Sequence, residues 1–568
     1  MAPPRQRSTA AGSRMTDNLP APSRRQALAG IAALGLAGCS TPPSPPQPTA
    51  SPPTLLPPSA PPSSTTGRLN AYGVSSGHPL ASQAGLKTLS AGGTAVDAAI
   101  AAAFADAVLQ PASSGIGGGG VSIVVRDGRA QNYDYREVVN RAGRIPRSGT
   151  GIPGFVAGMA ALHRDHGRLP WSTLLQPAIA LASDGAPVSR YLADTINAPL
   201  GRRVTKALPH FHASTGKPLT AGQRLIQAEL ARTMQQLARD GEDYFYRGAF
   251  TRALTQVEGL DASSLNAYRL QVSQPASGPV GSYTMLSGAP ALPGAAIIQM
   301  VQVAQAAGIG DLDPDSAAFI DVQSQAWQIA DQSVQTLFGD PAFVTVPVAR
   351  LTDPAANADL ARSMKRRPTA RIGPKYTGAP NTTHISVVDA HGTAVSMTNT
   401  ITNYWGSGQY VGGFFLNDQI GRFGDIGTTR ANTPSPGRRS VTWSSPSMLL
   451  DDQSRPALVI GAPGGRQIPN TTASVVLRWA LHHQSLPDAV RAPRFILDEG
   501  DLRLEAATHR NALTRLGYRA RVTAPSTRAN YGSVQALDVS WGDQAVRSYA
   551  DPRRSAGYAV ATGTPPPP

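Results

Sequence analysis

Thr382 has the residue type and surroundings of a possible nucleophile. It follows a polar loop and precedes an apolar, strand-like run, 383–389. A threonine hydroxyl needs a base beside it, and a threonine at a new N-terminus has its own base, the α-amine, with a pKa of about 8. Cleavage of the chain between Asn381 and Thr382 would create that group. Asn-Thr-Thr is also common where a turn meets a strand, so the pattern alone leaves both interpretations open.

Glycines that could bind an oxyanion follow a second strand-like run, 457–460. The next five residues, 461–465, read Gly-Ala-Pro-Gly-Gly and end in the adjacent pair Gly464 and Gly465. Consecutive glycines after a strand can direct two backbone N–H groups at one point, as an oxyanion requires. An ordinary tight turn is the alternative interpretation.

Three other patterns are weaker signals of chemistry. Gly73–Gly77 has GxSxG spacing but follows a polar segment instead of a buried strand, so we expect a plain turn there. The run Gly115–Gly120 leads into a strand and lacks Gly-Lys-Ser/Thr, which argues against nucleotide binding. The histidine pairs 210/212 and 482/483 have no carboxylate beside them, so we expect no metal site and no cofactor.

The composition limits the classes of partner. The chain has 568 residues, a net charge of +15 and only 15% charged residues. A basic excess can indicate nucleic-acid binding, but the densest basic stretch, 365–367, has only three residues and is interpreted as part of a solvated loop. No apolar run reaches the roughly 18–20 residues of a membrane-spanning helix. Because the basic residues are not clustered, we expect no nucleic-acid partner.

The N-terminus has the pattern of a lipoprotein signal peptide, residues 1–39. Arg24-Arg25 precedes the apolar stretch 27–36, and Leu-Ala-Gly-Cys ends at Cys39, the only cysteine. A basic region, a short apolar core and small residues are typical of a secretory signal, and the twin arginine suggests the route for folded cargo. The last four residues resemble a bacterial lipobox, whose cysteine receives a lipid. We expect an exported, cell-envelope or periplasmic protein whose only membrane contact is this anchor; a buried cysteine in a short helix is the alternative.

The rest of the chain predicts a layered α/β body between two unstructured ends. Residues 40–66 contain eleven prolines and no charge, which predicts an extended linker, and 561–568 read as a disordered tail. Thr94 and Asp97 form a capping-box pattern between two helical segments. The expected elements are helices over 79–91 and after Thr94, mostly helix over 155–270, strands over 121–125, 133–136, 383–389 and 393–400, a turn over 126–132, and a helix over 472–483.

Together these segments resemble the γ-glutamyltransferase (γ-glutamyltranspeptidase) family of N-terminal-nucleophile hydrolases. The resemblance covers about residues 68–560, in family order. It rests on the helix pair 82–99, the glycines 117–120, Tyr135-Arg136-Glu137, Ile152-Pro153-Gly154, the segment 381–389, Leu416-Asn417-Asp418-Gln419 and the glycine turn 461–465. It implies a four-layer αββα sandwich made from one precursor: a helical large subunit, 67–381, and a β-rich small subunit, 382–560.

The resemblance also implies a mechanism and its residues. Thr382 would attack the γ-carbonyl of a γ-glutamyl compound such as glutathione, and water or an acceptor amine would release the acyl group. Thr400 would hydrogen-bond the nucleophile. Gly464 and Gly465 would hold the oxyanion. Arg136 would bind the substrate α-carboxylate as a bidentate partner, and Gln419 would contact the substrate.

Three positions depart from the family pattern. Arg422 stands where an acid usually binds the α-ammonium, and a cation there would repel it, although Asp418 or Asp425 could substitute. Thr402 stands where the family has an asparagine. The paired serines of the carboxylate site align with Thr442-Trp443, or in a shifted register with Ser444-Ser445.

These departures leave three hypotheses open. The first is a γ-glutamyl hydrolase or transferase with altered contacts. The second is an acylase of the same fold for an acyl group without an α-ammonium, such as glutaryl, which would fit Arg422 better. The third is an inactive, lipid-anchored envelope protein that binds a ligand or has a structural role, and the retained nucleophile and glycines argue against it.

Overall fold

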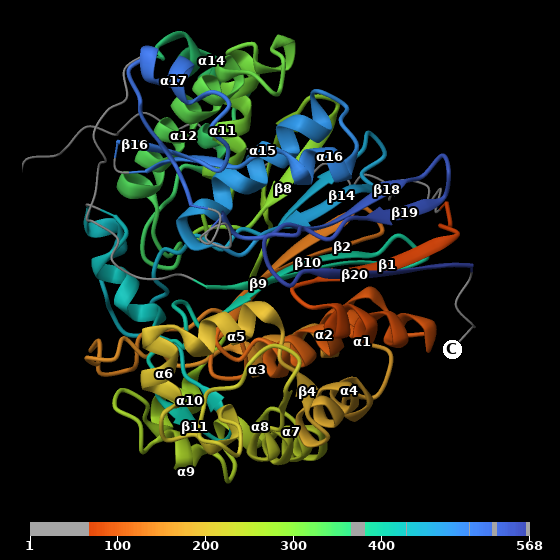
Figure 1. Cartoon of the computed structure of the whole chain (residues 1–568), viewed down its shortest axis with the longest axis vertical. Coiled ribbons are helices and arrows are strands. Elements are labelled where there is room, and N and C mark those ends of the chain that lie inside the picture. Colours follow the sequence, from red (N-terminus) through yellow and green to blue (C-terminus); the bar gives the residue numbers. More distant parts are fainter. Residues whose placement is uncertain (1–66, 365–380, 428, 499, 525–530, 564–568) are drawn as a thin grey trace, which may run out of the picture. The chain divides into compact units, whose positions relative to one another are not determined.

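Two antiparallel β-sheets lie face to face in the structure, a computed structural model of the chain (Figure 1). The structure describes residues 67–364, 381–427, 429–498, 500–524 and 531–563. All of them belong to one of the two units into which the chain divides, residues 63–568. The expected signal peptide, Cys39, the linker 40–66 and the basic stretch 365–367 lie outside the described residues.

The first sheet has seven strands in the order β20-β1-β9-β10-β2-β3-β6, and each neighbouring pair is antiparallel. The strands are β1 Ala71–Ser76, β2 Gly119–Arg126, β3 Arg129–Asp134, β6 Gln271–Ser273, β9 Thr383–Val388, β10 Ala394–Thr400 and β20 Gly557–Thr562. β9 and β10 form a hairpin whose last pair is Thr383 opposite Asn399. The next residues, Thr382 and Thr400, therefore lie opposite each other at its open end.

The second sheet has six antiparallel strands in the order β19-β18-β14-β13-β8-β7. They are β7 Ala276–Val280, β8 Tyr283–Ser287, β13 Ser447–Leu450, β14 Pro456–Gly461, β18 Gln535–Ser540 and β19 Ala545–Ser548. Both sheets contain strands from before and after residue 382. Two such chain segments would remain interleaved if the chain were cut there.

The facing surfaces of the sheets are apolar with a polar centre. Side chains such as Ile123 and Met448 share one buried cluster. Between the sheets, Ser386 Oγ donates to the Gln535 carbonyl at 3.1 Å, and Ser396 Oγ to the carbonyl of Ile460 at 3.1 Å. Because buried hydroxyls must be paired, these bonds fix how the two sheets sit on each other.

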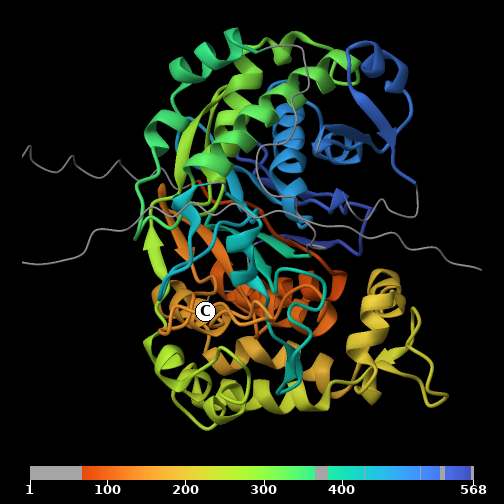
Figure 2. The same cartoon turned by 90° about the vertical axis from the view of Figure 1, so that its left-hand side faces the viewer.

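Helices cover the outer face of each sheet (Figures 1 and 2). On the first sheet, α2 contacts β9 and β10, and α3 contacts β2; on the second, α11 contacts β7 and β8, and α15 contacts β14. The helices are α1 Pro79–Ser90, α2 Ala95–Leu109, α3 Phe155–His166, α4 Trp171–Ser183, α5 Arg190–Asn197, α6 Pro199–Thr205, α7 Ala228–Asp240, α8 Asp243–Tyr246, α9 Thr251–Leu254, α10 Ala262–Ala267, α11 Gly294–Ala306, α12 Ala317–Leu337, α13 Val348–Leu351, α14 Pro354–Arg362, α15 Ile468–Ala480, α16 Leu486–Arg491 and α17 Arg510–Arg515. This arrangement is the expected four-layer αββα sandwich.

Smaller elements complete the described chain. They are the strands β4 Ala186–Pro187, β5 Arg224–Leu225, β11 Tyr410–Val411, β12 Phe414–Phe415, β15 Phe495–Asp498, β16 Asp501–Leu504 and β17 Arg519–Val522, and the 3-10 helices η1 Pro209–Phe211, η2 Ile309–Asp311, η3 Gln419–Gly424, η4 Arg430–Asn432 and η5 Gly465–Gln467. No helix within the described ranges has both the length and the apolar character needed to span a bilayer.

Several local predictions are confirmed and several are wrong. The capping box of Thr94 and Asp97 is present at the start of α2. The expected turn over 126–132 is wrong, because Asp127 and Gly128, with φ of 52° and 71°, make a tight turn and β3 begins at Arg129. Since β3 ends at Asp134, the expected strand over 133–136 is also displaced.

Other corrections concern the chain ends and one helix. Gly73–Gly77 is not a plain turn, because Ala71–Ser76 pairs with β20 and β9 as strand β1. The expected tail at 561 begins too early: β20 continues to Thr562. The helix expected over 472–483 begins at Ile468, with a proline in its first turn, where its missing N–H costs nothing.

Candidate active site

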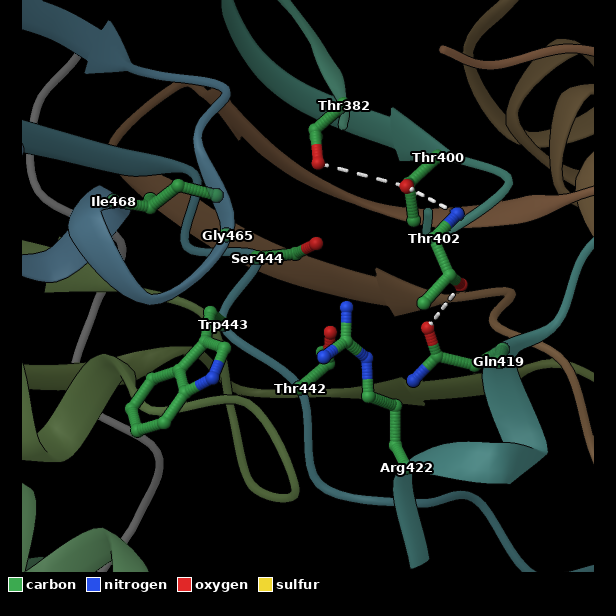
Figure 3. A pocket seen from close by; sticks show the side chains of 10 residues that line it. All are labelled: Thr382, Thr400, Thr402, Gln419, Arg422, Thr442, Trp443, Ser444, Gly465 and Ile468. Atoms are coloured by element: carbon green, nitrogen blue, oxygen red, sulfur yellow. Dashed lines mark hydrogen bonds between the residues drawn. The ribbon is translucent and has the colours of Figure 1, made fainter. Parts of the chain in front are cut away.

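A pocket lies at the open end of the β9–β10 hairpin (Figure 3). Its other walls come from the segment 419–444 and from the turn between β14 and α15. It is lined by Thr382, Thr400, Thr402, Gln419, Arg422, Thr442, Trp443, Ser444, Gly465 and Ile468. The pocket therefore brings together eight of the ten catalytic and substrate-binding residues expected from the sequence. The other two, Gly464 and Arg136, are not in its lining.

Thr382 and Thr400 place two hydroxyl groups next to each other at one end of the pocket. Thr382 Oγ1 lies 3.5 Å from Thr400 Oγ1, and the Thr400 hydroxyl donates to the carbonyl oxygen of Asn381 at 2.7 Å. The Thr400 oxygen also accepts from the backbone N–H of Thr402 at 2.7 Å. Thr400 therefore polarises the carbonyl of the Asn381–Thr382 peptide bond while it faces the Thr382 hydroxyl.

The glycine run 115–120 packs against this end of the hairpin. A Cβ on Gly118 would lie 2.2 Å from the carbonyl oxygen of Thr400, and one on Gly117 would lie 2.3 Å from that of Phe415. Only glycine permits such close backbone approach. The run therefore has a packing role beside the pocket.

The second glycine segment forms the turn from β14 into α15. Gly464 and Gly465 have φ of +134° and +61°. Both values lie in the region that favours glycine. Gly465 and Thr382 line the same pocket, so this turn brings glycine backbone into the lining.

Thr402 and Gln419 are joined to each other at the pocket wall. Thr402 Oγ1 donates to Gln419 Oε1 at 2.6 Å, and Gln419 Nε2 donates to Ser440 Oγ at 2.9 Å. Thr402 has a φ of +85°, an uncommon value for a β-branched residue. The backbone N–H of Thr402 donates to Thr400 Oγ1, so Thr400, Thr402 and Gln419 belong to one hydrogen-bond network.

Arg422 brings a buried cation into the pocket. The residue lies in η3 and is 4% exposed. Figure 3 shows its side chain reaching in from the side opposite Thr382 and Thr400. The Asp425 carboxylate is 3.8 Å from Arg422 Nη1. Among the described residues, none that lines the pocket is acidic.

The two acids considered as substitutes do not line the pocket. Asp418 accepts from the backbone N–H of Asn403 at 3.0 Å, and burial raises the pKa of the Asp418 carboxyl. Asp425 sits beside Arg422. Neither carboxylate is among the residues that line the pocket, so neither is positioned there to bind an ammonium group.

Arg136 is engaged elsewhere. Its Nε and Nη2 donate to the two carboxylate oxygens of Asp134 at 2.9 and 2.6 Å, and its Nη1 donates to the Ser440 carbonyl at 2.7 Å. The side chain is 1% exposed. The bidentate site expected for a substrate carboxylate is thus filled by a carboxylate two residues away in the chain.

The segment 442–445 contributes three residues to the pocket lining. Thr442, Trp443 and Ser444 line the pocket, whereas Ser445 Oγ donates to the Trp443 carbonyl at 2.9 Å. The hydroxyl-bearing pair at the pocket is therefore Thr442 and Ser444, which alternate along the chain. The sequence pattern predicted an adjacent pair, Thr442-Trp443 or Ser444-Ser445, and not this alternating one.

Titratable groups near the hairpin lie beneath the pocket. His384 is buried between the sheets, with Nδ1 2.8 Å from Thr398 Oγ1 and Nε2 3.1 Å from Ser386 Oγ. Burial lowers the pKa of His384 to about 3 and raises the pKa of Glu137 to about 8. Among residues with described coordinates, no group of three or more His, Cys, Asp or Glu could hold a metal ion.

Comparison with known proteins decides the family. Residues 81–561 match the family model described as Gamma-glutamyltranspeptidase. The chain belongs to the gamma-glutamyltranspeptidase family. The match includes every pocket residue, so the pocket lies in the part of the chain that defines membership.

Curated relatives in the family have different names and comparable similarity. The chain is 31% identical to the capsule biosynthesis protein CapD proenzyme of Bacillus anthracis, over 86% of this chain and 90% of that protein. It is 34% identical to the acylase ACY 1 proenzyme of Pseudomonas sp. SE83 (76% and 84% covered), and 32% identical to the glutathione hydrolase proenzyme of Pseudomonas aeruginosa (83% and 91% covered). All three are enzymes made as precursors.

A solved structure agrees with the fold. The cephalosporin acylase of Bacillus halodurans superposes with a TM-score of 0.78 at 21% identity, covering 87% of this chain and 96% of that one. This structural similarity supports the αββα fold described above.

Two residues that line the pocket, Ser444 and Ile468, were not among the site residues expected from the sequence. Ile468 lies at the start of α15, one turn after the glycines. Ser444 was considered only in the shifted register. Asn381 was expected only as the residue before the cut, yet its Oδ1 accepts three hydrogen bonds. No local pattern signals such bonds, because they come from distant parts of the chain.

Proposed function

We propose that this protein is a self-processing N-terminal-threonine amidohydrolase that transfers the acyl group of an amide from Thr382 to water or an amine. The observation that carries the proposal is the position of Thr400. Its hydroxyl donates to the carbonyl of the Asn381–Thr382 bond and faces the Thr382 hydroxyl. That geometry serves attack by Thr382 on its own preceding peptide bond.

The first reaction makes the enzyme. Thr382 Oγ1 attacks the Asn381 carbonyl carbon, the C–N bond breaks, and the hydroxyl proton passes to the new amine. Water then hydrolyses the ester, which leaves a carboxylate on Asn381 and restores the threonine hydroxyl. The freed α-amine, with a reference pKa of about 8, is the base for later turnovers.

The second reaction uses the same atoms on a substrate. Thr382 Oγ1 attacks the amide carbonyl, the Gly464 and Gly465 N–H groups hold the oxyanion, and the amine leaves with the proton from the α-amine. Thr400 fixes the nucleophile. Water or an acceptor amine then attacks the ester and frees the acid or a new amide.

Arg422 supports an acyl group that ends in a carboxylate and has no ammonium nearby. A buried guanidinium favours a carboxylate partner and disfavours a cation. Thr442 and Ser444 add two hydroxyls to the pocket lining. A short dicarboxylic half-amide such as a glutaryl amide meets these requirements, as expected from the second sequence hypothesis.

The γ-glutamyl hydrolase or transferase is the second candidate. The Gln419–Thr402 pair at the wall and the similarity to a glutathione hydrolase favour it. It requires an ammonium site that the described lining does not contain, and Arg136 could bind the α-carboxylate only by exchanging Asp134. Because the lining does not meet these requirements, we expect glutathione and related γ-glutamyl amides to be poorer donors than glutaryl amides.

We further propose export and a lipid anchor at Cys39, on the signal pattern of residues 1–39 alone. The enzyme would act in the bacterial envelope or periplasm. Labelling with a palmitate analogue tests this, and a Cys39→Ser variant that remains labelled would contradict it.

The decisive experiment is the intact mass of the purified protein in denaturant, with N-terminal sequencing of its fragments. We expect chains of residues 39–381 and 382–568, the second beginning with Thr382. A single uncut chain after long incubation would contradict self-processing. For the processed enzyme, glutaryl and γ-glutamyl anilides compared side by side then assign the acyl group, and equal or greater turnover of the γ-glutamyl anilide favours the second candidate.

A further inference from the structure

The Asn381 side chain is held by three donors on one oxygen. Its Oδ1 accepts from the Thr382 backbone N–H at 2.9 Å, from the Tyr191 hydroxyl at 3.0 Å and from Arg554 Nη1 at 2.9 Å. A carbonyl oxygen has two lone-pair directions, so three donors saturate it. The side chain therefore has little freedom to leave this position.

The rest of Asn381 is bonded as completely. Its Nδ2 donates to Ser113 Oγ at 2.6 Å, its backbone N–H donates to the Thr402 carbonyl at 2.8 Å, and its own carbonyl accepts from Thr400. Asn381 is fully buried. The two ends of the Asn381–Thr382 bond are thus fixed separately: the carbonyl oxygen by Thr400, and the nitrogen through Oδ1.

Two of the donors come from parts of the chain that do not line the pocket. Tyr191 lies in α5, and Arg554 precedes β20. They support each other: the Arg554 guanidinium carbon is 5.1 Å from the centre of the Tyr191 ring, and the Tyr404 hydroxyl is 2.6 Å from that of Tyr191. Burial raises the pKa of Tyr191 well above its ordinary value, so its hydroxyl keeps its proton.

We propose that Tyr191 and Arg554 are positioning residues for cleavage of the chain, acting through the Asn381 side chain. They fix the peptide bond so that its carbonyl carbon faces Thr382 Oγ1 and its nitrogen, bonded to Oδ1, is held in place as the leaving group. The inference rests on the proposed self-processing. It adds that the rate of cleavage depends on groups outside the substrate pocket.

The test follows cleavage of freshly made, full-length precursor by gel electrophoresis over time. A charge-assisted hydrogen bond to a buried group justifies an expected slowing of about tenfold for Arg554→Gln, and of about threefold or more for Tyr191→Phe. Asn381→Leu, which removes the acceptor itself, should slow cleavage at least as much as Arg554→Gln. Arg554→Lys should recover part of the rate.

The matched control is Arg547→Gln, an exposed arginine paired with Asp543 near the same end of the chain. It should cleave at the wild-type rate. Added guanidinium ion should speed cleavage of Arg554→Ala and leave Tyr191→Phe unchanged, a rescue that a merely structural role would not give.

Wild-type cleavage rates in both Arg554→Gln and Tyr191→Phe would overturn the inference while leaving self-processing intact. If Arg554→Gln fails to fold, Tyr191→Phe, which removes one oxygen, decides alone. A wild-type chain that stays uncut, or is cut elsewhere than before Thr382, would instead refute the proposed function. Normal folding with slowed cleavage in Tyr191→Phe supports the inference.

Discussion

The two sides of the pocket are built differently. Thr382 and Thr400 stand at the end of a hairpin whose strand pairing places them opposite each other. Arg422, Thr442 and Ser444 stand on a 3-10 helix and an irregular segment. The first side is fixed by backbone hydrogen bonds of a central sheet, whereas the second depends on side chains of connecting segments.

This difference predicts which side of the pocket tolerates substitution. A change at the hairpin end would disturb a sheet buried on both faces, so variation there is costly. Connecting segments tolerate substitution and carry specificity. If Thr382 is the nucleophile as proposed, one hairpin end could serve different acyl groups; the relatives carry different names, a capsule biosynthesis protein, an acylase and a glutathione hydrolase.

The largest effect should come from Thr382→Ala at the hairpin end. Without the hydroxyl, no acyl transfer can begin, so the chain should stay intact and turnover should fall by at least about a thousandfold. Intact mass and anilide hydrolysis measure both losses. Thr382→Ser, which keeps a hydroxyl, should still be cut; an alanine variant that cleaves at residue 382 would assign the nucleophile elsewhere.

Thr400→Val should have the next largest effect. It keeps the shape of the side chain but removes the donor to the Asn381 carbonyl and the contact with Thr382. Loss of one donor at a carbonyl under attack costs about a hundredfold in rate. The cleavage time course measures this, with Thr400→Ser as the control. A valine variant that matures normally would show that strand pairing alone is sufficient.

The hairpin side was largely predictable from the sequence. The strands flanking Thr382 and the capping box of Thr94 and Asp97 depend on neighbours within a few residues. The glycines of the turn after β14 were predicted for a similar reason, because no other residue adopts their φ readily.

The recognition side and the chain ends were less predictable because they depend on distant contacts. Strand β1 forms by pairing with β20 at the opposite end of the chain, which no local pattern shows. The sequence predicted that Arg136 binds a substrate carboxylate, whereas in the structure its Nε and Nη2 donate to the carboxylate of Asp134. The bonds to Asn381 come from residues 191 and 554, 190 and 173 positions away.

His384 gives a smaller effect that tests the rigidity of the hairpin side. Its pKa is lowered to about 3 by burial, against an unfolded value of 6.5, so the folded state excludes a proton that the unfolded state binds. The contribution of the neutral His384 to the free energy of unfolding is fully present above pH 6.5 and is lost as the pH falls from 6.5 toward 3. Between pH 7 and 5 the loss should be about 2 kcal/mol.

Urea unfolding of the uncut Thr382→Ala chain at pH 7 and 5 measures this loss. His384→Gln should be less stable at pH 7 but should lack that part of the pH dependence. His391→Gln, at the exposed turn of the same hairpin, is the control and should keep it. An unchanged pH dependence in His384→Gln would mean that the imidazole titrates with access to water.

The smallest effect concerns the recognition side, where Arg422→Gln should alter selectivity and spare maturation. Loss of the guanidinium removes the charge-assisted bond to an acyl carboxylate, so kcat/KM for a glutaryl anilide should fall about tenfold. The γ-glutamyl anilide should lose less, because its ammonium no longer meets a cation. Cleavage before Thr382 should proceed at the wild-type rate, since the variant keeps the Thr400 donor to the Asn381 carbonyl and the three donors to Asn381 Oδ1. Equal losses for both anilides would mean that Arg422 supports the structure of the pocket and does not select the acyl group, and the proposed division between a nucleophile side and a recognition side would then fail.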